Sequence, residues 1–183
     1  MRIFVLDTSA FIMGVNPSSI EGMAYSVPAV ADELPDGTMA SLRFNTSRIS
    51  GKLIVKMSDL RSENAVRTAS VQLGEDQVLS EADRQILALA LNLKLDGKAP
   101  TIVSDDYAIQ NVAERLKLSY SPLATFGISY EFDWILFCPA CFKKYPAGYA
   151  CAVCRVCGTE LKRKVLRKLR ARARAEWIQS LIF

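Results

Sequence analysis

Short apolar runs alternate with helix-like stretches through the first two thirds of the chain. Residues 3–6 (IFVL) and 101–103 (TIV) have the composition of strands buried on both faces, and each run ends at polar residues. Residues 52–57 (KLIVKM) alternate as a strand does. Residues 25–30 are predicted to form a further strand, although Pro28 is unfavourable inside one.

Helical patterns fill the intervals between these strands. The clearest helix spans residues 79–96, with Ser80 as its N-cap and Asp83 three residues later, in the place of a capping-box acid. Two more helices are predicted at residues 62–73 and 107–116, and residues 29–34 are predicted to open another, which residues 35–37 interrupt. The polar stretch 43–51 is ambiguous. Strands that alternate with helices predict an α/β domain with a mainly parallel sheet, whose sites form at the carboxyl edge.

Carboxylates gather where these elements end or begin. Asp7 follows the first strand, Asp105 and Asp106 follow the strand at 101–103, Asp83 lies in the first turn of a helix, and Glu33 lies near the start of another. Packed together, such acids repel one another unless a cation is present, and Mg²⁺ or Mn²⁺ suits an all-oxygen site. The set predicts a metal site that activates water and stabilises charge on a phosphate.

Each acid also has a structural explanation. Asp7 can cap the helix that follows it, Asp83 can serve only its capping box, and Asp105 with Asp106 can form an ordinary turn. Glu33 is ambiguous because Asp32 and Asp36 flank it. The whole set is therefore more informative than any member.

The residue composition limits which kinds of catalytic and metal site the chain can have. The chain has 183 residues, a length that suggests one large domain or one domain with a small module, and it has no histidine. The absence of histidine excludes nucleophiles that a histidine activates, a histidine general base and zinc sites with a histidine ligand. No run of 18 apolar residues appears, which predicts that nothing spans a membrane, and the early charges argue against a secretory leader.

Four segments resemble PIN-domain nucleases: LDTSAFI at 6–12, a helical Glu33, LSEADRQILALAL at 79–91 and VSDDYAIQNVA at 103–113. The resemblance covers about residues 1–125 and implies metal-binding acids at Asp7, Glu33, Asp83 and Asp106, with Asp105 beside them. The last motif leaves Asp105 and Asp106 as alternatives. Thr8 or Ser9 is expected to hydrogen-bond near the first acid.

The five cysteines all lie near the end of the chain. Cys138 with Cys141 and Cys154 with Cys157 form two CxxC knuckles, separated by 12 residues, which predict a tetrahedral structural Zn²⁺ site. Cys151 makes an overlapping CxxC with Cys154, but Gly158 favours the Cys154/Cys157 pair. A redox CxxC is the alternative. Clustered cysteines favour zinc over disulfides and hence a cytoplasmic location.

Charge is distributed unevenly. Residues 1–137 hold 12 basic and 17 acidic residues, whereas residues 138–183 hold 11 basic and 2 acidic ones. Residues 162–174 are predicted to form a basic helix that binds RNA phosphates, although a solvated basic face is the alternative. The predicted RNA-binding residues are Lys162, Arg163, Lys164, Arg167, Lys168, Arg170, Arg172 and Arg174.

The order of these parts is similar to that of the Nob family of archaeal and eukaryotic endonucleases that process ribosomal RNA. The expected parts are a PIN-like domain at 1–125, a connecting strand at 126–137, a zinc ribbon at 138–160 and a basic helical tail at 161–183. The resemblance implies an endoribonuclease that matures the 3′ end of small-subunit ribosomal precursor RNA, with that RNA and the pre-small ribosomal subunit as partners. The alternatives are a VapC-like toxin ribonuclease and a non-catalytic RNA-binding assembly adapter.

Overall fold

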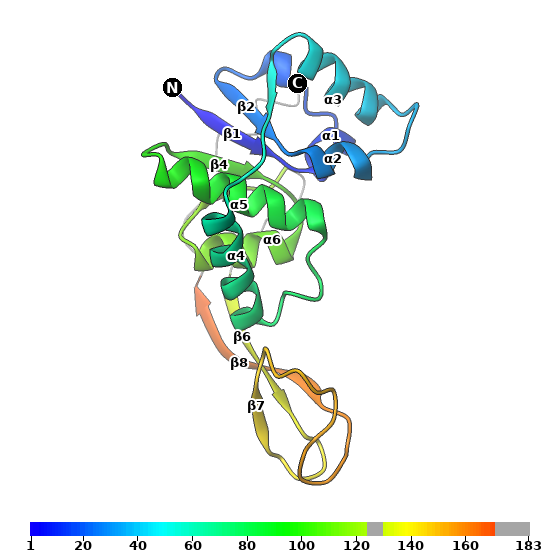
Figure 1. The fold of residues 1–183 in the computed structure, drawn as a ribbon, viewed down its shortest axis with the longest axis vertical. Coiled ribbons are helices and arrows are strands. Elements are labelled where there is room, and N and C mark those ends of the chain that lie inside the picture. Colours follow the sequence, from blue (N-terminus) through cyan, green and yellow to red (C-terminus); the bar gives the residue numbers. More distant parts are fainter. Residues whose placement is uncertain (124–129, 171–183) are drawn as a thin grey trace.

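A five-stranded parallel sheet forms the centre of the N-terminal unit (Figure 1). The computed structural model describes residues 1–123 and 130–170. The strand order is β3-β2-β1-β4-β5. The strands are β1 (Ile3–Leu6), β2 (Met23–Ser26), β3 (Leu53–Val55), β4 (Pro100–Val103) and β5 (Ser119–Ser121). All four residues of both β1 and β4 are buried, as their apolar sequences predict.

Helices surround this sheet, so the predicted α/β class with a mainly parallel sheet is confirmed. They are α1 (Thr8–Ile12), α2 (Pro28–Glu33), α3 (Met39–Ile49), α4 (Leu60–Leu73), α5 (Glu81–Leu95) and α6 (Tyr107–Arg115), with a 3-10 turn at Pro17–Ser19. Helix α5 carries an unbroken buried run at 86–91 and contacts both β1 and β4. The first turn of α5 is thereby fixed relative to the ends of the two central strands.

One local prediction needs correction, and two elements are new. The strand expected at 25–30 ends at Ser26, because Pro28 occupies the first turn of α2, where its missing N–H costs nothing. Most of the ambiguous polar stretch lies in α3, which ends at Ile49. Strand β5 was not predicted.

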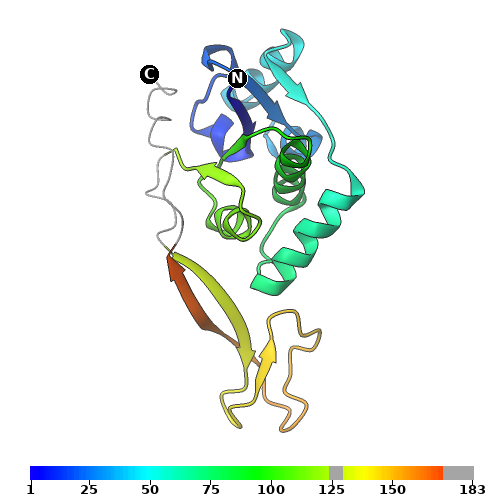
Figure 2. The ribbon, with the colours of Figure 1, turned by 90° about the vertical axis from the view of Figure 1, so that its left-hand side faces the viewer.

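A second, antiparallel sheet carries the cysteine region, in the order β7-β6-β8. Its strands are β6 (Tyr130–Phe137), β7 (Lys144–Pro146) and β8 (Lys162–Arg170). Strands β6 and β8 form a long hairpin that extends from the N-terminal unit, with the cysteine loops at its far end (Figure 2).

The prediction of a basic helix is wrong for residues 162–170. They form β8, which pairs with β6 from Phe137↔Lys162 to Tyr130↔Arg170. Residues 171–174 of that prediction lie outside the described residues. No helix in the described ranges has both the length and the apolarity to cross a bilayer.

Candidate active site and metal centre

The candidate active site lies where the strand order of the parallel sheet reverses, between β1 and β4. Leu6 and Val103 are paired at the ends of these strands, and the amide of Asp7 donates to the carbonyl of Val103 over 3.2 Å. The residues that follow both strands therefore meet at one carboxyl edge. Ligands of open α/β sheets bind at such a switch point.

Asp7 is the most buried acid of this edge, with 3% of its surface exposed. Its Oδ2 accepts from the hydroxyls of Ser9 (2.9 Å) and Ser104 (2.8 Å). Its Oδ1 is buried and has no hydrogen-bond partner among the described residues. Burial raises the pKa of Asp7, while the two hydroxyls oppose this shift. A buried carboxylate oxygen without a donor fits a metal ligand.

Capping alone does not account for Asp7. Asp7 occupies the N-cap position of α1, and the amides of Thr8 and Ser9 act to lower its pKa, but its side chain accepts no hydrogen bond of capping geometry. Stabilisation of the helix end therefore explains little of the burial of this carboxylate.

Asp83 faces the same edge from the first turn of α5. Its Oδ2 accepts from the amide of Ser80 (2.7 Å), while its own amide donates to the Ser80 hydroxyl (3.2 Å), so the predicted capping box is present. Burial raises the pKa of Asp83 to about 6, and the negative charges of Asp7 and Asp106 add to this shift against the opposing amide bond from Ser80. The capping box thus fixes Asp83 where it interacts with two other acids.

Asp105 and Asp106 point to different partners. Oδ1 of Asp105 accepts from the amide of Leu123 (2.9 Å). Oδ1 of Asp106 accepts from the amide of Ala108 (2.6 Å), which makes Asp106 the N-cap of α6. The charge of Asp106 is among the largest causes that raise the pKa of Asp83. This electrostatic interaction favours Asp106 as the acid of this pair that faces the site.

Glu33 reaches the site from a different place than expected. It is the last residue of α2 rather than a residue near its start, and its side chain is exposed. Its Oε2 accepts from the hydroxyl of Thr8, the residue after Asp7. Thr8 and Ser9 thus bind two different acids of the same edge.

Sequence reasoning missed Ser104, which organises the edge. Its fully buried hydroxyl donates to Asp7 and accepts from the amide of Asp106 (3.1 Å), so it links the acids of β1 and β4. Its position directly after the apolar run of β4 was the available signal. A side chain there shares the carboxyl edge with Asp7.

The acids stand farther apart than the cysteine sulfurs do. Within the described ranges, the four-cysteine group is the only cluster of three or more possible metal ligands, and the carboxylates of this edge do not form another. The acids nevertheless repel one another, and one oxygen of Asp7 has no partner among the described residues. This edge therefore offers the oxygen ligands that a hard divalent cation prefers. Asp7, Asp83 and Asp106 are the side chains that would hold it.

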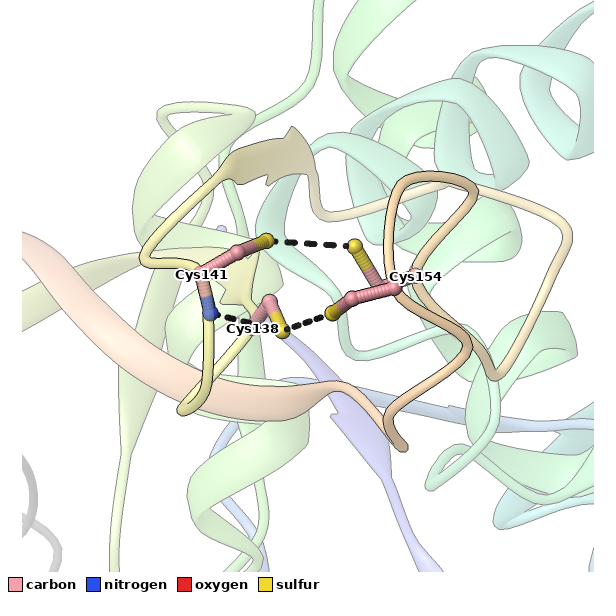
Figure 3. A group of neighbouring side chains, drawn as sticks. Cys138, Cys141 and Cys154 are labelled. Carbon is pink, nitrogen blue, oxygen red and sulfur yellow. Dashed lines mark hydrogen bonds between the residues drawn. The ribbon is translucent and has the colours of Figure 1, made fainter.

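The second candidate site is a group of four cysteine sulfurs, all within 4.8 Å of one another: Cys138, Cys141, Cys154 and Cys157. Sγ of Cys138 lies 3.4 Å from that of Cys157, and Sγ of Cys141 lies 3.5 Å from that of Cys154 (Figure 3). Cys151 is exposed and outside this group, which agrees with the choice of Cys154 and Cys157 for the second knuckle. Four thiolates in this arrangement are compatible with a structural zinc ribbon.

Local hydrogen bonds prepare the knuckles for metal. Burial acts to raise the pKa of Cys154, but hydrogen bonds from Tyr145 and the Val156 and Cys157 amides lower it to about 6. Phe142 and Gly158 follow the two knuckles, and both have left-handed backbones, with φ of 59° and 74°. Phe142 thus takes the turn that glycine takes in the second knuckle.

Aromatic residues fill the small core beside the knuckles. Tyr145 is buried and stacks on half-buried Tyr149 at 4.6 Å between ring centres. Phe142 is 74% exposed. Two of these three rings therefore serve packing.

The described basic side chains of β8 are exposed. The guanidinium of Arg163 lies 4.4 Å from the ring centre of Trp134, and Nζ of Lys164 lies 5.6 Å from that of Phe137. Lys162 is exposed as well. Arg167, Lys168 and Arg170 belong to the same strand, and Arg172 and Arg174 lie outside the described residues.

Comparison with known proteins shows the family. A model described as the PIN domain of ribonuclease matches residues 4–93. Endoribonuclease Nob1 of Pyrococcus abyssi is 38% identical over 161 residues, which cover 86% of this chain and 91% of that protein. Endoribonuclease Nob1 of Methanocaldococcus jannaschii is 34% identical over 167 residues, covering 91% of this chain and 80% of that protein.

A third relative is ribonuclease VapC1 of Thermoplasma acidophilum, 34% identical over 161 residues, which cover 88% of this chain and 77% of that protein. The similarity to the Nob1 proteins extends over most of the chain, and a four-cysteine cluster follows the PIN-like sheet. The chain therefore belongs to the Nob1 family of PIN-domain endoribonucleases.

Proposed function

We propose that this protein is a divalent-metal-dependent endoribonuclease that cleaves the precursor of small-subunit ribosomal RNA at its mature 3′ end. The observation that carries the proposal is the carboxylate of Asp7, buried at the switch point with one oxygen unpartnered and coupled to Asp83. Membership of the Nob1 family supports RNA as the substrate. The resemblance to rRNA-processing nucleases supports the choice of ribosomal precursor RNA.

Each residue of the edge has a distinct task in this proposal. Ser9 and Ser104 orient the Asp7 carboxylate by donating to one oxygen and leaving the other for a cation. Ser80 holds Asp83, and the start of α6 holds Asp106. Glu33 adds an exposed carboxylate that Thr8 steers toward the edge. When bound, Mg²⁺ or Mn²⁺ would activate water and stabilise charge on the scissile phosphate.

In this proposal, the sheet of β6, β7 and β8, here called the ribbon sheet, binds the RNA. Lys162 and Lys164 are exposed on β8, whereas the PIN-like domain carries an excess of acids. The phosphate backbone should therefore be held mainly by the ribbon sheet and the basic residues that follow it. Zinc at the four cysteines would hold the ribbon's fold and leave no open position for chemistry.

The test is cleavage of a synthetic archaeal small-subunit precursor RNA in Mg²⁺ and in Mn²⁺, with the product ends mapped. Asp7→Asn should lower the rate by about two orders of magnitude or more, because it removes a negative ligand but keeps the shape. The control Asp32→Asn changes an exposed acid on the neighbouring helix and should leave the rate unchanged. Equal rates for the wild type and Asp7→Asn would refute the assigned site.

The product pattern separates the alternatives. A single cut at the mature 3′ end supports the proposal, whereas cuts only in unrelated RNAs would favour the VapC-like alternative, which the similarity to VapC1 keeps open. Tight RNA binding without cleavage in either metal would favour the assembly adapter.

A further inference from the structure

A narrow junction joins the ribbon sheet to the PIN-like domain. A Cβ at Gly148, just after β7, would lie 2.4 Å from Cγ1 of Val71 on α4. A Cβ at Gly74, at the end of α4, would lie 3.2 Å from Cβ of Ala147, and Gly74 also has a left-handed φ of +71°. The two glycines therefore permit a close approach between α4 and the ribbon.

Pockets flank this junction on both sides. One has a volume of about 310 Å³ and the other about 510 Å³, and Trp134, Ile135 and Ala147 line both. Among the described residues, these two pockets interrupt the contact between the two units. Each interaction across the junction therefore bears on the orientation of the ribbon.

The charged contact of this strip is the pair Glu75 and Arg163. Glu75 is 6% exposed, and its Oε1 lies 3.5 Å from Nη2 of Arg163 on β8 and 3.4 Å from Nδ2 of Asn111 on α6. The Arg163 guanidinium also covers the ring of Trp134 on β6. One buried carboxylate thus connects the PIN-like domain to both long strands of the ribbon sheet.

The loop that carries Glu75 also leads to the acidic edge. The carbonyl of Glu75 accepts from the amide of Leu79 (3.1 Å), and Ser80, the next residue, caps α5. The adjacent Asp76 accepts from Arg84 through its own carbonyl over 3.0 Å. The same short loop therefore contacts the ribbon and sets the start of the helix that carries Asp83.

We propose that Glu75 is a positioning residue, which holds the ribbon through Arg163 so that bound RNA meets the acidic edge in one register. This inference rests on the proposed RNA cleavage. It also changes the assignment of Arg163, whose guanidinium is held by Glu75 and the ring of Trp134. Glu75 acts through the geometry of the two units and does not touch the reacting phosphate.

The test compares Glu75→Gln with the wild type under saturating RNA. Glutamine keeps an acceptor for Asn111 but removes the charge that attracts Arg163. The RNA dissociation constant should stay nearly constant, kcat should fall about tenfold, and the product ends should spread over neighbouring phosphates. A misplacement of about 1 Å can cost up to about 100-fold in rate, so a tenfold loss requires only a small reorientation.

Glu21→Gln is the matched control, because it removes one exposed acid from the same domain and should keep both kcat and the product ends. Arg163→Gln tests the pair from the half-exposed side, where solvent can replace the lost contact. Glu75→Gln combined with Arg163→Gln should lower kcat no further than either change alone.

Additive losses, or a wild-type kcat and a single product end for Glu75→Gln, would overturn the inference while leaving the proposed nuclease intact. A weaker RNA affinity with unchanged kcat would overturn it too, because Glu75 would then serve binding alone. A wild type that does not cut RNA would overturn the proposed function, and the inference with it.

Discussion

Asp7 and Asp83 are kept in surroundings that oppose their own ionisation. Burial raises the pKa of both, and Asp83 is further affected by the charges of Asp7 and Asp106. A carboxylate in such a place reduces stability and gains only when a cation arrives. Replacing either acid by its amide should therefore raise the free energy of unfolding and weaken the binding of a cation.

This opposition predicts the pH dependence of Asp83→Asn. The folded pKa of Asp83 is raised from 3.8 to about 6, so the wild-type free energy of unfolding should decrease as pH rises through that window. The variant lacks this decrease. In buffer without Mg²⁺ or Mn²⁺ it should be about 1–2 kcal/mol more stable than wild type at pH 7, and the difference should be small at pH 4.

Urea unfolding across this pH range provides the measurement. Asp32→Asn, at an exposed position, should show no comparable pH-dependent difference. A difference between Asp83→Asn and the wild type that is the same at pH 4 and pH 7 would contradict the raised pKa of Asp83.

The sequence predicted those site residues whose chemistry and place at the end of a strand were enough to mark them. Asp7 stands directly after one apolar run and Asp106 three residues after another, and the parallel sheet brings those strand ends together. Ser104 was missed because a serine after a strand has no chemistry of its own to mark it. Glu33 was placed near the start of a helix, but α2 ends at Glu33, because Pro35 follows two residues later and cannot continue it.

Among the elements, the start of α5 determines where Asp83 lies. Ser80→Ala removes the hydroxyl that accepts from the Asp83 amide, and should cost about 1 kcal/mol of stability. Ser80→Thr keeps a hydroxyl and should cost much less. Thermal unfolding of the two variants checks this, and equal losses for both would show that the cap contributes little.

The zinc knuckles give the second prediction at this scale. Cys157→Ser should lose most of the bound zinc, because its sulfur belongs to the group of four. Cys151→Ser should retain one Zn²⁺ per chain, because Cys151 lies outside it. Elemental analysis of the purified proteins decides, and equal zinc loss would mean that Cys151 is a ligand.

Elements with strong local patterns were predictable, and elements made by distant contacts were not. The apolar face and cap of α5 specify a helix without help from the rest of the chain. Strand β8 is rich in lysine and arginine, which favour helices, and it is a strand because β6 pairs with it. Strand β5 is three residues long and depends on β4 for its pairing.

For the whole molecule, β8 changes how RNA binding must be tested. Truncation before Lys162 would remove a strand of the ribbon sheet, so charge substitution is the better experiment. Combining Lys162→Gln with Lys164→Gln should make the slope of log affinity against log salt less steep by about 1.4 for single-stranded RNA. Lys52→Gln with Lys56→Gln, on the PIN-like domain, serves as the matched control. Equal slopes for the two pairs would mean that β8 does not bind phosphates.

The pairing of Tyr130 with Arg170 places the two ends of the β6–β8 hairpin side by side. The chain therefore enters and leaves the ribbon at neighbouring points, so the part of the ribbon that carries the cysteines can be deleted without separating β6 from β8. Joining the two strands above the cysteines with an Asn-Gly turn would preserve the remaining register. Such a deletion would keep the residues of the acidic edge. Comparing its RNA affinity and cleavage with those of the full chain would show which of the two depends on the cysteine loops.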